Sequence, residues 1–559
     1  MTDWNRLKRI FAKMPLFEKT ALLFLCAILI AALTHFAYTV VNFPDAQANA
    51  ETYSEGMVGR IATLNPLFAD FNDTDRDLTE LLFSGLIKYD PVARNFLPDL
   101  AAKWERSRNG LTYVFTIRDD ASWHDGTPLT AADIVFTYKG IIQHPDFRNP
   151  ILKNTFEGVG IDQTGTNTVT FTLSKPNSYF ISNLTTGILP KHLLSNASIA
   201  RLDADAFGKA PIGSGPYKLA SLKRGEDGDV IELERNETYY AAIPAIPKLR
   251  FFIFRTEREL LLHKNSLRGL SKLGDSARNT LAKDPRFLFH DYSLNQFTAL
   301  YYNTENPRLT DQSVRKLLAA AINKDELLTP DSVRIDTINL ENKRDEADFA
   351  WDPEGAKKKL EELEYRKNEK GILIDNKGEV FQLTVLTLEK TPLHLTENLK
   401  RQWEALGIQV KIDRQEGQNF ASYLAEGRYD VLLIRQNLGY NRDAYPLLHS
   451  SQIGANGLNF SRFKSFRTDG LTEAIRIESI PEDKEKLLTQ LSSVLIEELP
   501  IVFISTPNYT YALDKTLTPF PQDSSLDFHS DRLTILTELE FLDTESETEF
   551  TGDGGLSAL

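Results

Sequence analysis

The sequence contains a single cysteine, Cys26, in a chain of 559 residues. One thiol cannot form an internal disulfide or a cysteine-rich zinc cluster, and Cys26 lies in an apolar N-terminal segment rather than in the folded body. Glycine and proline are also few, at 30 and 25 residues. This composition argues against disorder and favours a globular body of two or three domains.

An excess of positive charge is missing as well. The chain has 64 Lys and Arg residues against 78 Asp and Glu residues, a formal net charge of −14. Binding to phosphate backbones requires clustered Lys and Arg in excess. We therefore expect no nucleic-acid partner.

Motifs for metal binding and nucleophilic catalysis are absent. The nine histidines are scattered, without an H-x-x-x-H or H-E-x-x-H pair, and no G-x-S-x-G occurs. The stretch "GSGPYK" resembles a phosphate loop but lacks its full spacing, and Pro216 removes one N–H donor. We expect no cofactor, no metal and no enzymatic activity, although a metal site assembled in space stays open.

One long apolar run is present, at 20–41, with His35 as its ionisable side chain. At about 1.5 Å per residue, a helix of this length can cross a hydrocarbon layer of about 30 Å. Basic residues precede it and acidic residues follow it: Arg6, Lys8, Arg9, Lys13 and Lys19, then Asp45, Glu51 and Glu55. This asymmetry predicts a transmembrane anchor with residues 1–19 in the cytoplasm, a linker at 42–50, and the main body extracellular or periplasmic.

Two other readings of this segment stay open. A cleaved signal peptide would use "ANA" at 48–50, but the apolar run is longer than usual and the site lies some distance beyond it. A lipoprotein would modify Cys26, which follows "LFL" rather than small residues. We favour the uncleaved anchor.

The remaining chain predicts a mixed α/β protein. Period-two alternation indicates strands at 113–119 and 168–173, and an apolar-rich run at 248–254 also reads as a strand. Farther on, a strand at 381–388, a helix at 396–407 and a strand at 408–413 form a strand–helix–strand unit typical of a parallel sheet. The acidic tail at 543–559 cannot pack a core and is expected to be disordered.

The stretch "WHDGTPLTAADIVFTY" at 123–138 places His124 beside Asp125, which suggests a catalytic pair. Adjacent side chains on an extended chain point in different directions, so direct pairing is awkward. The glycine and proline that follow favour a turn, and Thr130 with Asp133 has the spacing of a helix capping box. We interpret His124 as a turn residue.

The same stretch resembles the signature of the family 5 extracellular solute-binding proteins, the peptide, dipeptide and nickel receptors of ABC importers. Six further segments are similar to family blocks and follow in the family's order: 211–219, 301–328, 351–363, 399–412, 429–452 and 498–511. The spacing of these segments covers nearly all of 51–540.

The resemblance implies an α/β fold of the periplasmic-binding-protein type, with two lobes that close on a ligand by hinge motion. Lobe I would hold 51–292 and a return segment at 498–542, and lobe II would hold 293–497. It implies a monomeric receptor that captures peptides for the permease subunits of an ABC importer. Two stretches depart from the family pattern, 260–275 and 329–350, and we assign no ligand contacts to them.

Alternatives to a peptide ligand stay open within the resemblance. Nickel, haem and oligosaccharides are possible ligands for the same fold. An extracellular hydrolase is a further alternative from a different class, and it would require a nucleophile with a base, or two carboxylates in a cleft.

The resemblance also implies a ligand site. A carboxylate that captures the peptide ammonium is expected on the segment after the strand at 429–436, where the match is Asp443. The peptide would add as an extra strand along two segments. The expected ligand-binding residues are Tyr53, Ser54, Glu55 and Gly56 on one segment, Gln436, Asn437, Gly439 and Tyr440 on the other, and in addition Asn303 and Tyr445.

Overall fold

The computed structural model describes residues 14–42, 51–69, 72–226, 228–335, 350–454, 457–478, 480–521 and 526–542. In helix α2 (Leu16–Asn42), side chains are described for 17–30 only. Within these residues, no helix combines the length and the apolar character needed to cross a membrane. Of the predicted linker at 42–50, residues 43–50 lie outside the described residues, as does the acidic tail at 543–559.

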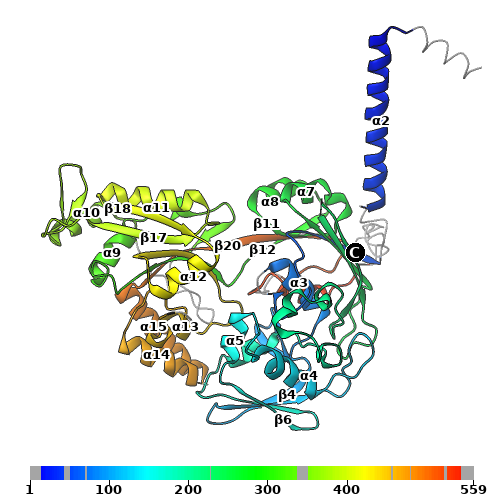
Figure 1. Ribbon diagram of the computed structural model, residues 1–559, viewed down its shortest axis with the longest axis horizontal. Coiled ribbons are helices and arrows are strands. Elements are labelled where there is room, and N and C mark those ends of the chain that lie inside the picture. Colours follow the sequence, from blue (N-terminus) through cyan, green and yellow to red (C-terminus); the bar gives the residue numbers. More distant parts are fainter. Residues whose placement is uncertain are drawn as a thin grey trace, which may run out of the picture.

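Two lobes lie side by side, joined by strands that run from one to the other (Figure 1). The first, lobe I, comprises β1 to β12 and the last helix, α16. Its strands are β1 (Thr52–Val58), β2 (Ile87–Asp90), β3 (Asn95–Pro98), β4 (Ala101–Arg106), β5 (Thr112–Ile117), β6 (Gly160–Gly165), β7 (Thr168–Thr172), β8 (Tyr217–Arg224), β9 (Gly228–Arg235), β10 (Lys248–Phe254), β11 (Gly269–Leu273) and β12 (Phe287–Ser293).

The helices of lobe I are α3 (Asp73–Leu82), α4 (Ala131–Val135), the π-helix η3 (Phe136–Ile142), α5 (Pro150–Phe156), η4 (Phe180–Thr185), α6 (Lys191–Leu194), η5 (Ile199–Ala204), η6 (Ala206–Lys209), α7 (Glu257–Leu262), η7 (Lys264–Ser266), α8 (Asp275–Leu281) and α16 (Asp531–Leu536). Helices α7 and α8 lie at the top of lobe I, and α4 and α5 lie in its lower half, above β4 and β6 (Figure 1).

Lobe II comprises β13 to α15. Its elements are β13 (Gln296–Tyr302), α9 (Gln312–Ala320), η8 (Lys324–Leu327), β14 (Ser332–Arg334), α10 (Pro353–Glu362), β15 (Arg366–Lys367), β16 (Leu373–Ile374), β17 (Gln382–Leu388), α11 (Leu393–Leu406), β18 (Gln409–Gln415), α12 (Gly417–Glu426), β19 (Val431–Asn437), α13 (Tyr445–Leu448), η9 (Ser450–Gln452), α14 (Phe466–Ile477) and α15 (Pro481–Glu498).

One strand, β20 (Ile501–Asp514), belongs to both lobes. Its first part pairs antiparallel with β13 of lobe II, and its last part pairs antiparallel with β11 and β12 of lobe I. The result is a continuous 12-stranded sheet in the order β18-β17-β19-β13-β20-β11-β1-β10-β9-β8, with β12 and β14 also on β20. The return segment, predicted to lie in lobe I alone, thus serves both lobes.

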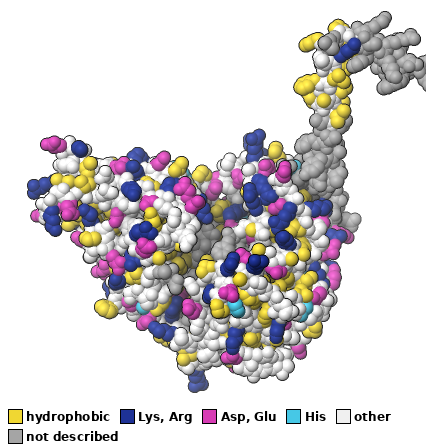
Figure 2. Space-filling view, viewed as in Figure 1, with side chains coloured by type: hydrophobic (Ala, Val, Ile, Leu, Met, Phe, Trp, Pro, Cys, Tyr) yellow, Lys and Arg dark blue, Asp and Glu magenta, His cyan; other side chains and the backbone are white. Residues whose placement is uncertain are grey.

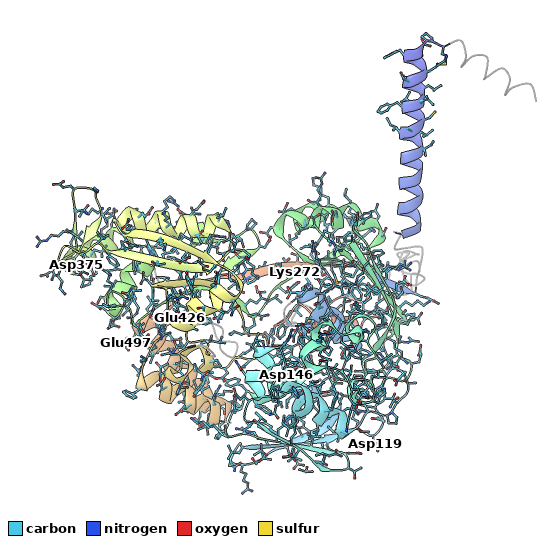
Figure 3. The ribbon with its side chains drawn as sticks, viewed as in Figure 1. Asp119, Asp146, Lys272, Asp375, Glu426 and Glu497 are labelled. Atoms are coloured by element: carbon cyan, nitrogen blue, oxygen red, sulfur yellow. The ribbon has the colours of Figure 1, made fainter. Side chains whose placement is uncertain are left out.

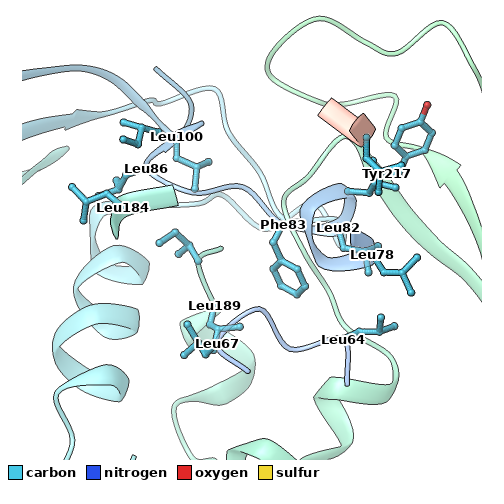
Figure 4. Packing of buried hydrophobic residues seen from close by; sticks show 14 of the residues in the cluster. Leu64, Leu67, Leu78, Leu82, Phe83, Leu86, Leu100, Leu184, Leu189 and Tyr217 are labelled. Atoms are coloured by element: carbon cyan, nitrogen blue, oxygen red, sulfur yellow. The ribbon is translucent and has the colours of Figure 1, made fainter. Parts of the chain in front are cut away.

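Each lobe has its own apolar core. In lobe I, leucine and aromatic side chains from α3, β8 and the segments around them pack together, among them Leu78, Leu82, Phe83 and Tyr217 (Figure 4). In lobe II, two clusters cover the two faces of the sheet, one under α9 to α11 and one under α12 to α15 (Figure 1). Burial of these side chains is the main stabilising term.

Several local predictions are confirmed. The strand–helix–strand unit is present as β17, α11 and β18, and β17 pairs parallel with β18. Gly407 ends α11 with φ of 100°, a left-handed value that favours glycine. The capping box of α4 is formed, with the Asp133 carboxylate accepting from the Thr130 N–H at 2.9 Å.

Candidate functional site

The two lobes meet where β12 ends and β13 begins. Only two residues, Leu294 and Asn295, separate these strands, and both strands pair with β20. The Asn295 carbonyl accepts from the Leu438 N–H at 2.9 Å, and its side-chain amide donates to the Gly439 carbonyl at 2.7 Å. The loop that follows β19 is therefore fastened to the connection between the lobes.

Strand β19 points its C-terminal end at this junction and has one free edge there. It pairs with β13 along its whole length, from Val431 to Asn437. On its other side, β17 pairs with it only as far as Leu433. Among the described residues, the main chain at 434–437 therefore has a strand partner on one side only. Such an edge can accept an added peptide strand.

Strand β1, the other expected partner of a peptide, has no such edge. It pairs parallel with β10 throughout, and with β11 at Glu55 and Gly56. The Ser54 carbonyl also accepts from the Arg268 N–H at 2.8 Å. A Cβ on Gly56 would lie 2.6 Å from the Leu267 side chain, so this glycine allows β1 to pack closely. Addition of a peptide strand along 53–56 does not fit this arrangement.

The side chains of β1 take part in a buried polar network instead. Glu55 is fully buried and forms an ion pair with Arg532, at 2.5 Å from Nη2. The Tyr53 hydroxyl donates to Glu55 at 2.6 Å and lies 2.5 Å from the Tyr511 hydroxyl. Burial, followed by the Glu55 charge, raises the pKa of both tyrosines well above the ordinary value. The network ties the first strand to the end of the chain.

The network continues to α3. Arg532 also pairs with Asp77 at 2.8 Å, and Asp77 contacts His529 Nδ1 at 2.7 Å. Burial and the neighbouring Arg532 lower the pKa of His529, which is therefore neutral near pH 7. These groups join β1, α3 and α16, and we interpret them as structural.

The loop at 438–443 reaches from lobe II into lobe I. The Tyr440 ring lies 4.6 Å from the Tyr89 ring and 4.7 Å from the Phe528 ring, centroid to centroid, and its hydroxyl donates to Asp531. Gly439 has φ of 52°, and a Cβ there would lie 2.0 Å from the Phe528 ring. Glycine is therefore required for the close approach of this loop to lobe I.

An ion pair reinforces this contact. Arg442 Nη2 lies 2.7 and 3.0 Å from the two Asp527 oxygens, with the two side chains 13% and 4% exposed. Asp531 accepts from the Asp527 and Phe528 N–H groups at 2.8 and 2.9 Å. Burial nevertheless raises the pKa of Asp531 to about 7. Residues of the lobe II loop at 438–443 are thus docked on lobe I directly beyond the free edge of β19.

Asp443, the expected ammonium anchor, is buried and already paired. Its side chain is 2% exposed, and Oδ2 accepts from Arg476 Nε and Nη2 at 2.7 and 2.5 Å. Oδ1 accepts from the Tyr445 N–H at 3.0 Å, at the start of α13. The Arg476 guanidinium also lies 3.7 Å above the Tyr445 ring. This geometry gives Asp443 and Tyr445 a structural part in lobe II, and their binding of a ligand stays a prediction.

Asn303 lies elsewhere in lobe II, at the opposite end of β13 and β19. It helps to line a polar pocket of about 450 Å³ together with Arg428, Asp430 and Arg462. Glu426, at the end of α12, also lines it and lies on the lobe II side of the junction (Figure 3). The Asn303 amide donates to the Tyr429 carbonyl at 2.8 Å. The pocket is separate from the free edge of β19.

Gln436 and Asn437 are the expected residues that do lie on the free edge. Gln436 contacts the Tyr301 hydroxyl through its side chain, and the Asn437 side chain accepts from the Gly439 N–H at 2.9 Å. Of the expected residues, the structure brings Gln436, Asn437, Gly439 and Tyr440 together at the junction and sets Asn303 apart.

His124 has hydrogen bonds that suit a turn residue. Its Nδ1 accepts from the Gly213 N–H at 3.2 Å, and its Nε2 lies 3.1 Å from the Gly215 carbonyl. Burial lowers its pKa to about 4, so the ring is neutral near pH 7. The neighbouring Asp125 pairs with His192 instead, at 2.8 Å. The hydrogen bonds of His124 therefore hold the turn at 213–215 against the loop before α4.

Some residues at the junction were not predicted from the sequence. Arg442 and Asp527 are 85 residues apart in the chain, and Arg476 is 33 residues from Asp443. No short-range spacing links these pairs, so only a three-dimensional model or covariation could find them.

Over the described ranges, no group of three or more His, Cys, Asp or Glu side chains is arranged to hold a metal ion. The charges on the face in Figure 2 are of both signs and intermixed.

A family model described as bacterial extracellular solute-binding proteins, family 5 Middle, matches residues 95–457. The chain is 26% identical over 503 residues to the oligopeptide-binding protein AppA of Bacillus subtilis (strain 168), covering 85% of this chain and 90% of AppA. It is 24% identical over 470 residues to the dipeptide-binding protein of Escherichia coli (strain K12), covering 76% and 83%.

Solved structures show the same fold. AppA from Bacillus subtilis in complex with a nonapeptide has a TM-score of 0.69 at 24% identity, covering 88% of this chain and 99% of that one. NikZ from Campylobacter jejuni in complex with Ni(L-His) has a TM-score of 0.68 at 24% identity, covering 88% and 100%. At these identities the likeness concerns the two-lobed architecture and leaves the ligand open.

Proposed function

Because the chain belongs to the bacterial extracellular solute-binding proteins of family 5, we propose that it captures peptides between its two lobes and delivers them to an ABC importer. Its relatives include proteins named for binding oligopeptides and dipeptides. The ligand would stabilise the closed arrangement of the lobes, which the permease subunits then recognise. We expect the receptor to act as a monomer.

The free edge of β19 carries this proposal. Main-chain groups at 434–437 lack a second strand partner in the described structure and lie directly before the loop that docks on lobe I. Hydrogen bonds to a peptide main chain do not depend on the peptide's side chains, so this edge suits a receptor for varied sequences. Since β1 pairs with β10 along its length and with β11 at Glu55 and Gly56, we propose that a segment of lobe I other than β1 completes the site.

Native mass spectrometry of the purified ectodomain with a synthetic pool of di- to nonapeptides tests the proposal. We expect complexes whose mass corresponds to one intact peptide for each protein. Shortened peptides after incubation would favour the hydrolase alternative. No bound peptide of any length, together with retention of a nickel complex, haem or an oligosaccharide, would contradict the proposed ligand class.

We also propose that the segment at 20–41 tethers the receptor to the membrane. The proposal rests on the length of the apolar run and on the basic residues before it. A tethered protein should stay with the membrane fraction after a carbonate wash, and its N-terminus should include residues before 20. A soluble product that begins near Glu51 would indicate cleavage instead.

A further inference from the structure

A second contact joins the two lobes, and it uses none of the residues of the loop at 438–443. The segment at 175–180, called the latch below, belongs to lobe I and follows β7. The Ser178 N–H donates to the Arg476 carbonyl in the last turn of α14 at 2.9 Å. Lys175 Nζ lies 3.8 Å from Glu473 Oε1 on the same helix. The latch of lobe I therefore lies against α14 of lobe II.

Tyr179 supplies the apolar part of this contact. It is 7% exposed and lies in a hydrophobic cluster whose other members come from lobe II or from the part of β20 that pairs with β13. Lys484 Nζ, on α15, lies 4.0 Å from the centroid of the Tyr179 ring, which is within the range of a cation–π contact. Separation of the lobes would expose this ring to water, at a cost in free energy.

The next residue, Phe180, packs into the other lobe. It is 2% exposed in the core of lobe I, and its ring centroid lies 5.3 Å from that of Tyr113. The Tyr113 hydroxyl donates to the Asn177 carbonyl at 2.8 Å, and the Asn177 side chain accepts from the Tyr179 N–H at 3.0 Å. Two consecutive side chains thus belong to the cores of different lobes, while the backbone that carries them is fixed to lobe I.

The contacts of the latch do not require a ligand, because both partners in each contact belong to the chain itself. A ligand shifts the equilibrium between open and closed lobes only by the difference in its affinity for the two states. Contacts that the chain makes between its own lobes reduce the free energy that the ligand has to supply. The same contacts have to break before the lobes separate and a ligand between them leaves.

We propose that the latch at 175–180 holds the lobes together in the ligand-free receptor and slows the release of a bound ligand. This inference rests on the proposed function in one respect, the position of the ligand between the lobes. Tyr179 is its main determinant. The side chains of Lys175 and Glu473 are 74% and 49% exposed, and an ion pair at such a surface contributes little.

Fluorescence energy transfer between two dyes measures the separation of the lobes. Cys26→Ser leaves the full chain without a cysteine, so dyes can be attached through Asp146→Cys on lobe I and Glu497→Cys on lobe II, two exposed positions labelled in Figure 3. This labelled chain, called the reference chain, is studied as single molecules in mild detergent after dialysis to remove ligand. We expect it to populate mainly the state of higher transfer.

Three further variants of the reference chain test the latch. In Tyr179→Ala, the ratio of the higher-transfer to the lower-transfer population should fall at least tenfold, because the buried ring is lost. Lys484→Gln changes a partly exposed side chain, keeps the ring and should lower the ratio about threefold. Tyr423→Ala is the matched control. Its ring lies 3.9 Å from the Arg428 guanidinium, but both residues are in lobe II, so the ratio should stay unchanged.

The release of ligand is measured with a synthetic tetrapeptide pool. Each protein is loaded with the pool and then diluted, and mass spectrometry follows the peptide that stays bound. We expect Tyr179→Ala to release the pool at least tenfold faster than the reference chain, and Tyr423→Ala to release it at the same rate as the reference chain.

An unchanged population ratio in both Tyr179→Ala and Lys484→Gln would overturn the latch and leave the proposed function intact. So would a reference chain that populates mainly the lower-transfer state without ligand. An unchanged release rate in Tyr179→Ala would overturn the control of release. If the ratio falls in Tyr179→Ala but no chain retains any peptide, the proposed function is overturned, and the control of release with it.

Discussion

Strands β1 and β19 carry the two segments expected to hold a ligand main chain, and the structure treats them in opposite ways. β1 pairs on both sides, and its Glu55 is fully buried in an ion pair. β19 pairs on one side beyond Leu433 and exposes Arg435 and Asn437. Two short segments thus become a strand paired on both sides or a strand with a free edge, according to the neighbours that distant parts of the chain supply.

The largest expected effect is a difference in the free energy of unfolding between a variant of β1 and a variant of β19. Glu55→Gln leaves Arg532 buried beside one fewer carboxylate and should lower the free energy of unfolding by about 3–5 kcal/mol. Arg435→Gln, the matched change on β19, should shift it by less than about 0.5 kcal/mol because the side chain is exposed. Urea unfolding measures both. Equal losses of unfolding free energy in the two variants would contradict the difference between a strand paired on both sides and a strand with a free edge.

The docking of the loop after β19 predicts a pH dependence. The pKa of Asp531 is about 7 in the folded state, above its ordinary value, so the folded protein keeps a proton that the unfolded chain releases. Wild type should therefore lose stability relative to Asp531→Asn as the pH rises from about 4 to 7, by about 2–4 kcal/mol, with no further change above 7.

Urea unfolding of both proteins at pH 5 and pH 8 measures this difference. Asp119→Asn, an exposed change on lobe I (Figure 3), is the matched control and should show no such trend. Parallel stability curves for wild type and Asp531→Asn would show that Asp531 does not titrate in this range.

Substitution of Asp443 should have a smaller effect on stability, and it distinguishes a structural role from that of an ammonium anchor. Asp443→Asn removes the charge that pairs with Arg476 and should cost about 1–3 kcal/mol of stability. Affinity for free-amine and N-acetylated peptides should then change equally and little. If Asp443 is instead the ammonium anchor, the variant loses at least tenfold of its affinity for the free-amine peptide alone, with stability unchanged.

The smallest expected effect is local. A retained peptide at about ten times its Kd should slow amide hydrogen exchange in a fragment covering 434–437 by about tenfold, or about 1.4 kcal/mol. Without peptide, amides of β1 should already exchange far more slowly than those of this fragment. Unchanged exchange at 434–437 while peptide is bound would place the ligand elsewhere.

Much of the fold could be predicted from the sequence, because local chemistry and ordered family blocks both point to it. The capping box at Thr130 and the helix end at Gly407 depend on residues a few positions apart. The site was harder. The role of Glu55 depends on Arg532, 477 residues away, and a segment such as "YSEG" carries no sign that both its edges are filled.

The same limit applies to charge. Asp443 and Arg435 look alike in the sequence, as single charged residues near the end of a strand. In the folded chain Asp443 is buried and paired with Arg476 on α14, whereas Arg435 is exposed on β19. A resemblance to a family transfers the architecture reliably, whereas the pairing of one side chain depends on contacts that each sequence changes.

Strand β20 also has a consequence for how the protein is made. Tyr53 and Tyr511, which lie in contact, are 458 residues apart, and β20 completes the sheets of both lobes. A chain that emerges N-terminus first exposes unpaired strand edges in both halves until its last tenth has appeared. Long-range pairing of this kind is slow and prone to aggregation. Synthesis and export therefore have to protect an almost complete but unfinished sheet, and truncation before β20 should leave neither lobe able to fold.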